Sequence, residues 1–168
     1  VPAILQALNE AFHLAFESVV PTGKRLLIGL DISSSMNWSM ISGSGLSAAK
    51  AAAALSLVTL AREESAQVLG FSDRLVPLGL HGGMTITEVM ERADRANFGA
   101  TDCALPMIWA TENRQEIDAF VILTDNETWY GDRHPSEALG EYRQTMGIEA
   151  RLIVVAMTAN QFSIADPR

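Results

Sequence analysis

Three short polar segments carry oxygen-bearing side chains of the kind that hard divalent cations bind. In the first, Asp31-Ile32-Ser33-Ser34-Ser35, a carboxylate and two hydroxyls occupy alternate positions. The second contains Thr101, and the third contains Asp125. Mg²⁺ takes about six oxygen ligands at roughly 2.1 Å. These residue types therefore predict a cation site, provided that the fold brings the three segments together.

Each segment also has a purely structural interpretation. The first could be a Ser-rich turn after a buried strand. In the second, Thr101 or Asp102 could cap the helix expected to follow, because hydroxyl and carboxylate oxygens accept the free N–H groups of a first helical turn. Asp125 could be an ordinary turn former. What favours the cation is that all three segments lie where a predicted strand ends or in a loop beside such an end.

The apolar pattern predicts alternating helices and strands. Helices are expected at 2–18, 47–64, 85–96, 102–113 and 135–146, and strands at 24–32, 67–71, 75–80, 118–124 and 151–157. Thr85 followed by Glu88 is a capping-box pattern at a helix start, and Gly147 is placed to end the last helix. The strand at 75–80 is expected to be antiparallel at an edge, because Ser72-Asp73 favours a hairpin-like turn.

This order indicates an α/β fold with three layers, α/β/α, resembling the Rossmann-like class. Its central sheet should be mostly parallel, with one antiparallel edge strand. In such sheets ligands bind at the carboxyl ends of the strands, where the three polar segments are expected. We expect a single domain over 1–168, in which residues 1–20 form a helix that links this domain to another module or braces it. Because the sequence begins at Val1, we expect it to be part of a longer chain.

Composition narrows the classes of function. The 168 residues include 20 acidic and 12 basic side chains, for a formal net charge of −8. This balance disfavours strong direct nucleic-acid binding, which needs a cationic face, and favours metal cations. No apolar run reaches the roughly 18 residues of a membrane span. The single cysteine, Cys103, fits a reducing cytosol, and we interpret it as a buried structural thiol. No secretory signal is evident.

The five positions Asp31, Ser33, Ser35, Thr101 and Asp125 resemble the metal-ion-dependent adhesion site of von Willebrand factor A-type domains in residue type and order. The resemblance extends from about Lys24 to the end. It implies a bound Mg²⁺, or another divalent cation such as Mn²⁺ or Ca²⁺. It also implies that the domain binds a partner rather than catalyses a reaction.

Three longer stretches resemble the carboxy-terminal domain of Ro autoantigen proteins, which follows a ring of helical repeats called the TROVE module. They are LLIGLDISSSM (26–36), GATDCALPMIWA (99–110) and LTDNETWYGDRHP (123–135). The resemblance implies a cytoplasmic ribonucleoprotein that binds small non-coding Y RNAs and misfolded RNAs in RNA quality control. The absent upstream ring would make most RNA contacts, and bacterial relatives work with an exoribonuclease.

The expected site would use the hydroxyls of Ser33, Ser35 and Thr101 as ligands, with Asp31 and Asp125 coordinating directly or through water. An open position on the ion would then accept a carboxylate from a protein or another ligand. A rim of apolar and aromatic side chains is expected around the ion if the loops are exposed, and otherwise these side chains cover the loop backbone: Met36, Trp38, Trp129 and Tyr130.

Three alternatives remain open from the residues alone. A Mg²⁺-dependent phosphatase with an aspartyl nucleophile would need a second Asp as general acid, where this chain has Ser33. A structural domain with a vestigial metal site would fold identically without the ion. Direct RNA contact is the third alternative, through the ion or through a local patch of Arg62, Arg74, Arg92 and Arg95.

Overall fold

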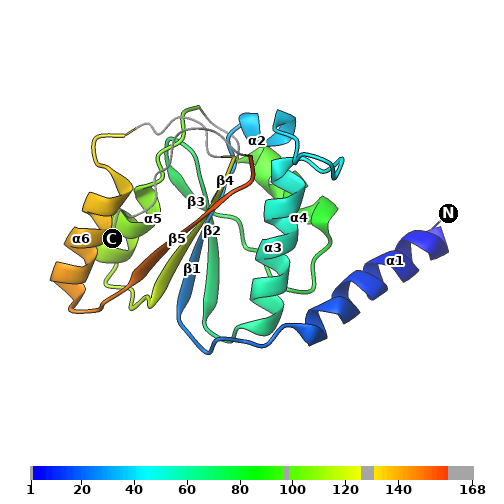
Figure 1. The fold of residues 1–168 in the computed structure, drawn as a ribbon, viewed down its shortest axis with the longest axis horizontal. Coiled ribbons are helices and arrows are strands. Elements are labelled where there is room, and N and C mark those ends of the chain that lie inside the picture. Colours follow the sequence, from blue (N-terminus) through cyan, green and yellow to red (C-terminus); the bar gives the residue numbers. More distant parts are fainter. Residues whose placement is uncertain (1, 97–98, 126–130, 159–168) are drawn as a thin grey trace.

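A five-stranded sheet forms the centre of the molecule in the computed structural model, which describes residues 2–96, 99–125 and 131–158 (Figure 1). The strand order is β3-β2-β1-β4-β5, and only β3 runs antiparallel to its neighbour. The strands are β1 (Leu26–Asp31), β2 (Ala66–Phe71), β3 (Leu75–Pro77), β4 (Ala119–Thr124) and β5 (Arg151–Ala156). The mostly parallel sheet with one antiparallel edge strand is therefore confirmed.

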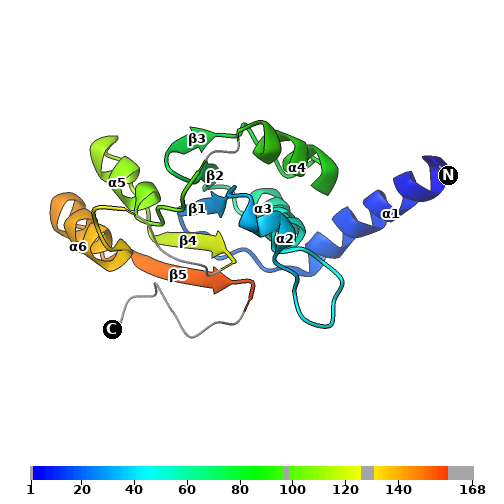
Figure 2. The same ribbon diagram turned by 90° about the horizontal axis from the view of Figure 1, so that it is seen from above.

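Helices cover both faces of this sheet (Figure 2). One face packs against α3 (Ala48–Arg62) and α4 (Ile86–Arg95), and the other against α5 (Leu105–Glu112) and α6 (Pro135–Met146). A one-turn helix, α2 (Ser35–Trp38), follows β1. At the amino end, α1 (Pro2–Ala15) and the 3₁₀ turn η1 (Phe16–Ser18) precede the sheet. Three layers result, as the alternating pattern predicts.

Local signals set most of the helix boundaries. Thr85 and Glu88 form the predicted capping box at the start of α4. Gly147 ends α6 in the left-handed region at φ 67°, which glycine adopts without strain. Two expectations were inaccurate. The helix predicted from 102 begins only at Leu105, because Asp102 is used in the preceding turn, and α2 was not predicted because it is a single turn.

The central strands are buried because each face has its own hydrophobic core. Leu27 and Phe120 point into the core under α5 and α6, whereas Ile28 and Leu30 point into the core under α3. Gly29 lets α5 approach β1 closely, since a Cβ there would lie 2.8 Å from the Cγ of Pro106. The sheet and its helices therefore form a rigid support for the loops at the carboxyl edge.

The amino-terminal helix α1 is an exception to this packing. None of its residues is buried, and four of its apolar side chains are each more than 60% exposed: Ile4, Leu5, Leu8 and Leu14. Only the following Phe16 enters the core, beside Phe12. No helix among the described residues is long and apolar enough to span a bilayer.

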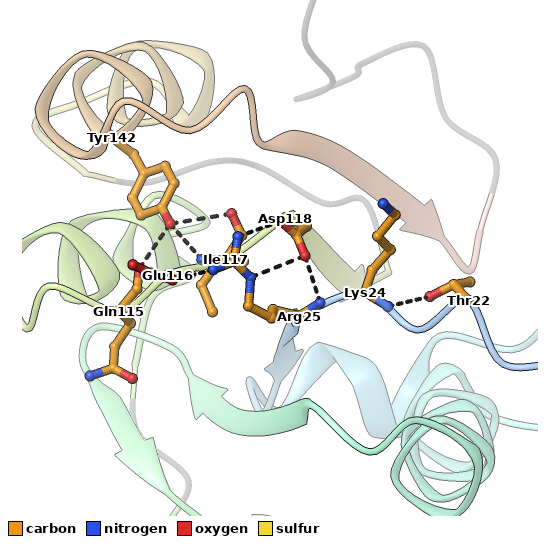
Figure 3. Close-up of polar contacts among 8 residues, drawn as sticks. All are labelled: Thr22, Lys24, Arg25, Gln115, Glu116, Ile117, Asp118 and Tyr142. Carbon is orange, nitrogen blue, oxygen red and sulfur yellow. Dashed lines mark hydrogen bonds and ion pairs between the residues drawn. The ribbon is translucent and has the colours of Figure 1, made fainter.

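At the amino edge of the sheet, polar contacts join β1 to β4 (Figure 3). The Arg25 guanidinium donates to both carboxylate oxygens of Asp118, at 3.1 and 2.6 Å, and its backbone N–H donates to the same group at 2.9 Å. These bonds to Arg25 lower the pKa of Asp118 to about 2. The start of β1 and the start of β4 are thereby held in register, with charge and counter-charge adjacent.

The Tyr142 hydroxyl completes this edge from α6 (Figure 3). It accepts a hydrogen bond from the Ile117 N–H at 2.6 Å, and it lies within hydrogen-bond distance of the carbonyls of Gln115 (2.8 Å) and Ile117 (3.2 Å). The ring is fully buried and packs edge-on against Phe120 at 4.9 Å. The Tyr142 hydroxyl thus supplies hydrogen-bond partners to backbone groups of the segment that leads into β4.

Replacing Tyr142 with Phe tests this contribution. Tyr142→Phe keeps the ring contact with Phe120 but removes the only described acceptor of the Ile117 N–H. A buried donor left without a partner costs about 1–3 kcal/mol, so we expect the free energy of unfolding in urea to fall by about that amount. An unchanged unfolding midpoint would contradict this role for the hydroxyl.

Candidate metal centre

Asp31 ends β1 and is almost completely buried, with 2% of its surface exposed. One carboxylate oxygen accepts the Ser33 N–H at 2.9 Å, and the other accepts the Thr124 hydroxyl at 2.7 Å. Thr124 ends the neighbouring strand β4, so this second bond joins the carboxyl ends of the two central strands. The carboxylate of Asp31 is therefore held in one orientation by two donors from different strands.

The turn after β1 brings Ser33 and Ser35 together. Their hydroxyl oxygens lie 3.0 Å apart, and Ser33 is buried while Ser35 is partly exposed. The one-turn helix α2 begins at Ser35, and its backbone bonds close the turn on itself, with the Met36 N–H donating to the Ser33 carbonyl. The alternating spacing of the first motif therefore converges as predicted, with Asp31, Ser33 and Ser35 on one turn.

Asp125 follows β4 directly and is 1% exposed. Its carboxylate accepts the Ser39 hydroxyl at 2.9 Å. Its backbone carbonyl accepts the Thr158 hydroxyl from the segment after β5. The third motif is thus attached to the segment that follows β1 and to the segment that follows β5.

The loop carrying Thr101 lies against the same edge of the sheet. The Asp102 N–H donates to the Ser72 carbonyl at 2.8 Å, and Ser72 follows β2, whose last residue Phe71 is the register partner of Asp31. Gly131, from beyond β4, approaches Asp102 so closely that a Cβ would lie 2.7 Å from its carboxylate. The loop between α4 and α5 therefore meets residues that follow β2 and β4.

Thr101 itself is half-buried in this loop. Among the described residues, no hydrogen bond joins its hydroxyl to the other four side chains of the predicted site. Neither Thr101 nor Asp102 caps α5, because the N-cap position belongs to Ala104 and the Asp102 carboxylate accepts the Ala104 N–H inside the preceding turn. The capping interpretation of this segment is therefore wrong.

Cys103 lies beside this cluster of carboxylates. Its thiol is 1% exposed, and burial raises its pKa strongly, with further increases from the negative charges of Asp31, Asp102 and Asp125. A thiol held in its neutral form at ordinary pH is a poor nucleophile. The structural interpretation of Cys103 is consistent with this environment.

The electrostatics of the cluster are unbalanced at Asp31. The pKa of this carboxyl is raised to about 6. Burial is the largest cause, hydrogen bonds from Ser33 and Thr124 oppose it, and the nearby charge of Asp125 adds a smaller increase. No Lys, Arg or His in the described part of the chain forms an ion pair with Asp31. Buried carboxylates close together are costly unless a cation or a proton neutralises them.

The donor set fits a hard cation better than a soft one. It consists of hydroxyl and carboxylate oxygens, which Mg²⁺, Mn²⁺ and Ca²⁺ prefer. Within residues 2–96, 99–125 and 131–158, no three His, Cys, Asp or Glu side chains gather in a way that would hold a metal on their own. Any ion at this edge would thus depend on the serine and threonine hydroxyls.

The predicted rim is only partly supported. Trp38 is 83% exposed beside the motif, as a rim residue should be. Met36 is 1% exposed and packs in the core under α3, so its assignment to an exposed rim is wrong, because α2 turns this side chain inward. Trp129 and Tyr130 lie outside the described residues.

Sequence reasoning missed two residues, Ser39 and Thr124. Both hydroxyls donate to the carboxylates of the candidate site. Thr124 directly precedes Asp125 in the third segment, but nothing in its type or spacing distinguishes it from an ordinary strand residue. Ser39 lies four residues beyond the motif in a serine-rich segment and carried no signal of its own.

Residues 25–168 match the family model described as the Ro60 vWA domain, which is the decisive comparison. The chain belongs to this family. It is 47% identical to "RNA-binding protein RO60" of Deinococcus radiodurans, over all of this chain and 32% of that protein. It is 45% identical to "RNA-binding protein RO60" of Caenorhabditis elegans, over 98% of this chain and 26% of that protein.

The fold agrees with a solved relative. The crystal structure of the Deinococcus radiodurans RO (RSR) protein superposes with a TM-score of 0.89 at 46% identity, covering all of this chain and 34% of that one. The Ro60 vWA domain resemblance drawn from the motifs is therefore confirmed. The chain spans about a third, or less, of the length of these relatives.

The raised pKa of Asp31 predicts how stability depends on pH when no divalent cation is present. Its folded-state pKa of about 6 lies above the ordinary value of 3.8. The folded state therefore holds the proton more tightly than the unfolded state, and the resulting stabilisation is complete below pH 3.8 and is lost as the pH rises through 6. Asp31→Asn cannot ionise and should escape this loss. Between about pH 4 and pH 7, the variant should gain up to about 3 kcal/mol relative to the wild type.

Urea unfolding in EDTA at several pH values measures this difference. The asparagine oxygen can still accept the Ser33 N–H, but its NH2 group cannot accept the Thr124 hydroxyl, so the change of the difference with pH, and not its size at one pH, reports the charge. Parallel pH profiles for the wild type and Asp31→Asn would show that burial of this carboxyl carries no penalty.

Proposed function

We propose that this Ro60 vWA domain binds a divalent cation, Mg²⁺, with Mn²⁺ or Ca²⁺ as substitutes, through Asp31, Ser33, Ser35, Thr101 and Asp125. The observation that carries the proposal is the pair of buried carboxylates, Asp31 and Asp125, at the ends of adjacent strands. Together with neighbouring hydroxyls, they present only oxygen donors. A divalent cation would neutralise these charges where Asp31 has no basic partner.

The roles of the residues follow from their chemistry. The hydroxyls of Ser33, Ser35 and Thr101 would hold the ion, and the carboxylates of Asp31 and Asp125 would supply negative charge beside it. With few direct carboxylates, a bound ion stays electron-poor and can accept an anionic oxygen from outside. We propose that this oxygen is a carboxylate of a protein partner, and that the exposed Trp38 contributes apolar contact beside it.

Binding, rather than catalysis, suits this arrangement. Both oxygens of Asp31 accept hydrogen bonds from the protein, which fix the orientation of its carboxylate. The neighbouring acid that phosphoryl transfer needs is replaced by Ser33. Both relatives are named as RNA-binding proteins and not as enzymes.

In the longer proteins of this family, we propose, the domain serves cytoplasmic small non-coding RNA binding, including Y RNAs, and RNA quality control. RNA would be held mainly by another module, and an exoribonuclease would be a partner. The net charge of −8 supports this division. The four arginines considered for direct contact are each engaged internally, with Glu91, Asp73 or backbone carbonyls: Arg62, Arg74, Arg92 and Arg95.

Thermal unfolding with and without Mg²⁺ tests the cation. Binding to the folded state alone stabilises it by about 2.7 kcal/mol when the free ion is a hundredfold above its dissociation constant. We expect the wild type to melt at a higher temperature in Mg²⁺ than in EDTA. The double variant Asp31→Ala with Asp125→Ala should show no such increase.

Ser34→Ala is the matched control, because Ser34 lies within the same motif but is exposed and makes no side-chain cap bond. It should respond to Mg²⁺ as the wild type does. Identical melts of the wild type in Mg²⁺ and EDTA would refute the proposed metal site and favour a purely structural domain.

We further propose that α1 braces this domain against another module when it is part of a longer chain. Its apolar side chains Ile4, Leu5 and Leu8 are exposed, and an isolated helix of 14 residues is only marginally stable in water. The family model begins at residue 25, whereas the aligned relatives extend over α1 and continue well beyond this chain.

Deleting residues 1–11 tests this role. The deletion removes exposed surface but leaves Phe12 and Phe16, so we expect the melting temperature of the isolated domain to change by no more than about 2 °C. In a longer chain, Leu5→Glu with Leu8→Glu should lower the stability measured by the same melt. A large loss of stability in the isolated domain would assign α1 to the domain's own fold.

A further inference from the structure

Ser39 is held at a junction of three elements. Its N–H donates to the Ser35 carbonyl at 2.8 Å, which ends α2, and its carbonyl accepts the Ala48 N–H at 2.7 Å, where α3 begins. Its hydroxyl donates to a carboxylate oxygen of Asp125 at 2.9 Å. The backbone of Ser39 is therefore fixed on both sides, and its side chain reaches 86 residues along the chain to the end of β4.

The contact has a counterpart on the other side of the candidate centre. Thr124, from β4, donates its hydroxyl to Asp31, which ends β1. Ser39, from the segment after β1, donates its hydroxyl to Asp125, which follows β4. Each acidic side chain is thus oriented by a hydroxyl that belongs to the other strand's segment. Moving either segment would disturb the carboxylate of the other.

We propose that Ser39 is a positioning residue for the metal centre, whose hydroxyl holds the Asp125 carboxylate in the orientation that receives the cation. The inference rests on the proposed function and extends it to a residue outside the five ligand positions. A hydroxyl bonded to one carboxylate oxygen restricts rotation of the whole group. Outer hydrogen bonds of this kind typically alter metal affinity about 10- to 100-fold when removed.

The same bond connects the metal centre to the surface. Trp38 is the residue immediately before Ser39 and is 83% exposed. Because the backbone of Ser39 is fixed to α2 and α3, a displacement of the Trp38 segment would be transmitted to Asp125 through one side chain. Contact between a partner and Trp38 would in this way be coupled to the geometry at the ion.

Titration calorimetry with Mg²⁺ on the 168-residue domain tests the proposal. Ser39→Ala should weaken Mg²⁺ binding by about 10-fold or more, because Asp125 loses its orienting donor. Ser39→Thr keeps the hydroxyl and should remain within about threefold of the wild type. Ser34→Ala removes an exposed hydroxyl from the same segment and should bind as the wild type does.

A second measurement needs no cation. In EDTA, the unfolding free energies of Ser39→Ala, Asp125→Ala and the double variant form a thermodynamic cycle, in which each single variant removes the hydrogen bond between the two side chains. Their effects should be non-additive, because the two side chains share one hydrogen bond. Additive effects would overturn the proposal, since Ser39 would then act without Asp125.

The remaining outcomes separate this inference from the proposed function. A wild type that binds no Mg²⁺ refutes both. If the wild type binds Mg²⁺ and Ser39→Ala binds it equally well, the metal site stands and the role of Ser39 is refuted. Equal weakening by Ser39→Ala and Ser39→Thr would also refute it, because the effect would then come from packing and not from the hydroxyl.

Discussion

Two carboxylates buried at the ends of adjacent parallel strands are the constraint on which the rest of this structure depends. Asp31 and Asp125 are each at most 2% exposed, in a place where water cannot stabilise their charge. The protein meets part of this cost with hydroxyl and backbone donors from Ser33, Ser39 and Thr124. These bonds orient the carboxylates but do not neutralise them, which explains why burial still raises the pKa of Asp31 to about 6.

The same two strands carry an opposite arrangement at their other ends. Arg25, just before β1, pairs with Asp118, just before β4, and the pKa of that carboxyl falls to about 2. At the amino edge of the sheet, this neutralised pair therefore holds β1 and β4 in register (Figure 3). The carboxyl edge retains unneutralised acid at Asp31. One edge contributes stability, and the other retains the charge that a cation could bind.

The composition and exposed surface of the Ro60 vWA domain are in keeping with this difference between the two edges of the sheet. The domain is acidic overall, and two of the four arginines considered for RNA contact, Arg62 and Arg92, donate to backbone carbonyls within the domain. Its exposed apolar side chains include Trp38 beside the candidate metal centre and those on one side of α1 at the far end. The first is where we propose that a carboxylate-bearing partner binds, and the second is where we propose that another module packs. The two surfaces are separate in the fold (Figure 1).

Sequence alone determined the layered α/β fold, the antiparallel edge strand and the convergence of Asp31, Ser33 and Ser35, because these depend on local periodicity and on the rule that parallel strands end at one edge. Tertiary structure decided the rest. The bonds from Thr124 to Asp31 and from Ser39 to Asp125 join residues 93 and 86 positions apart, and no local pattern encodes which hydroxyl will face which carboxylate. Met36 turned inward for the same reason: a single helical turn sets its direction, and only the packing of α2 on α3 selects that turn.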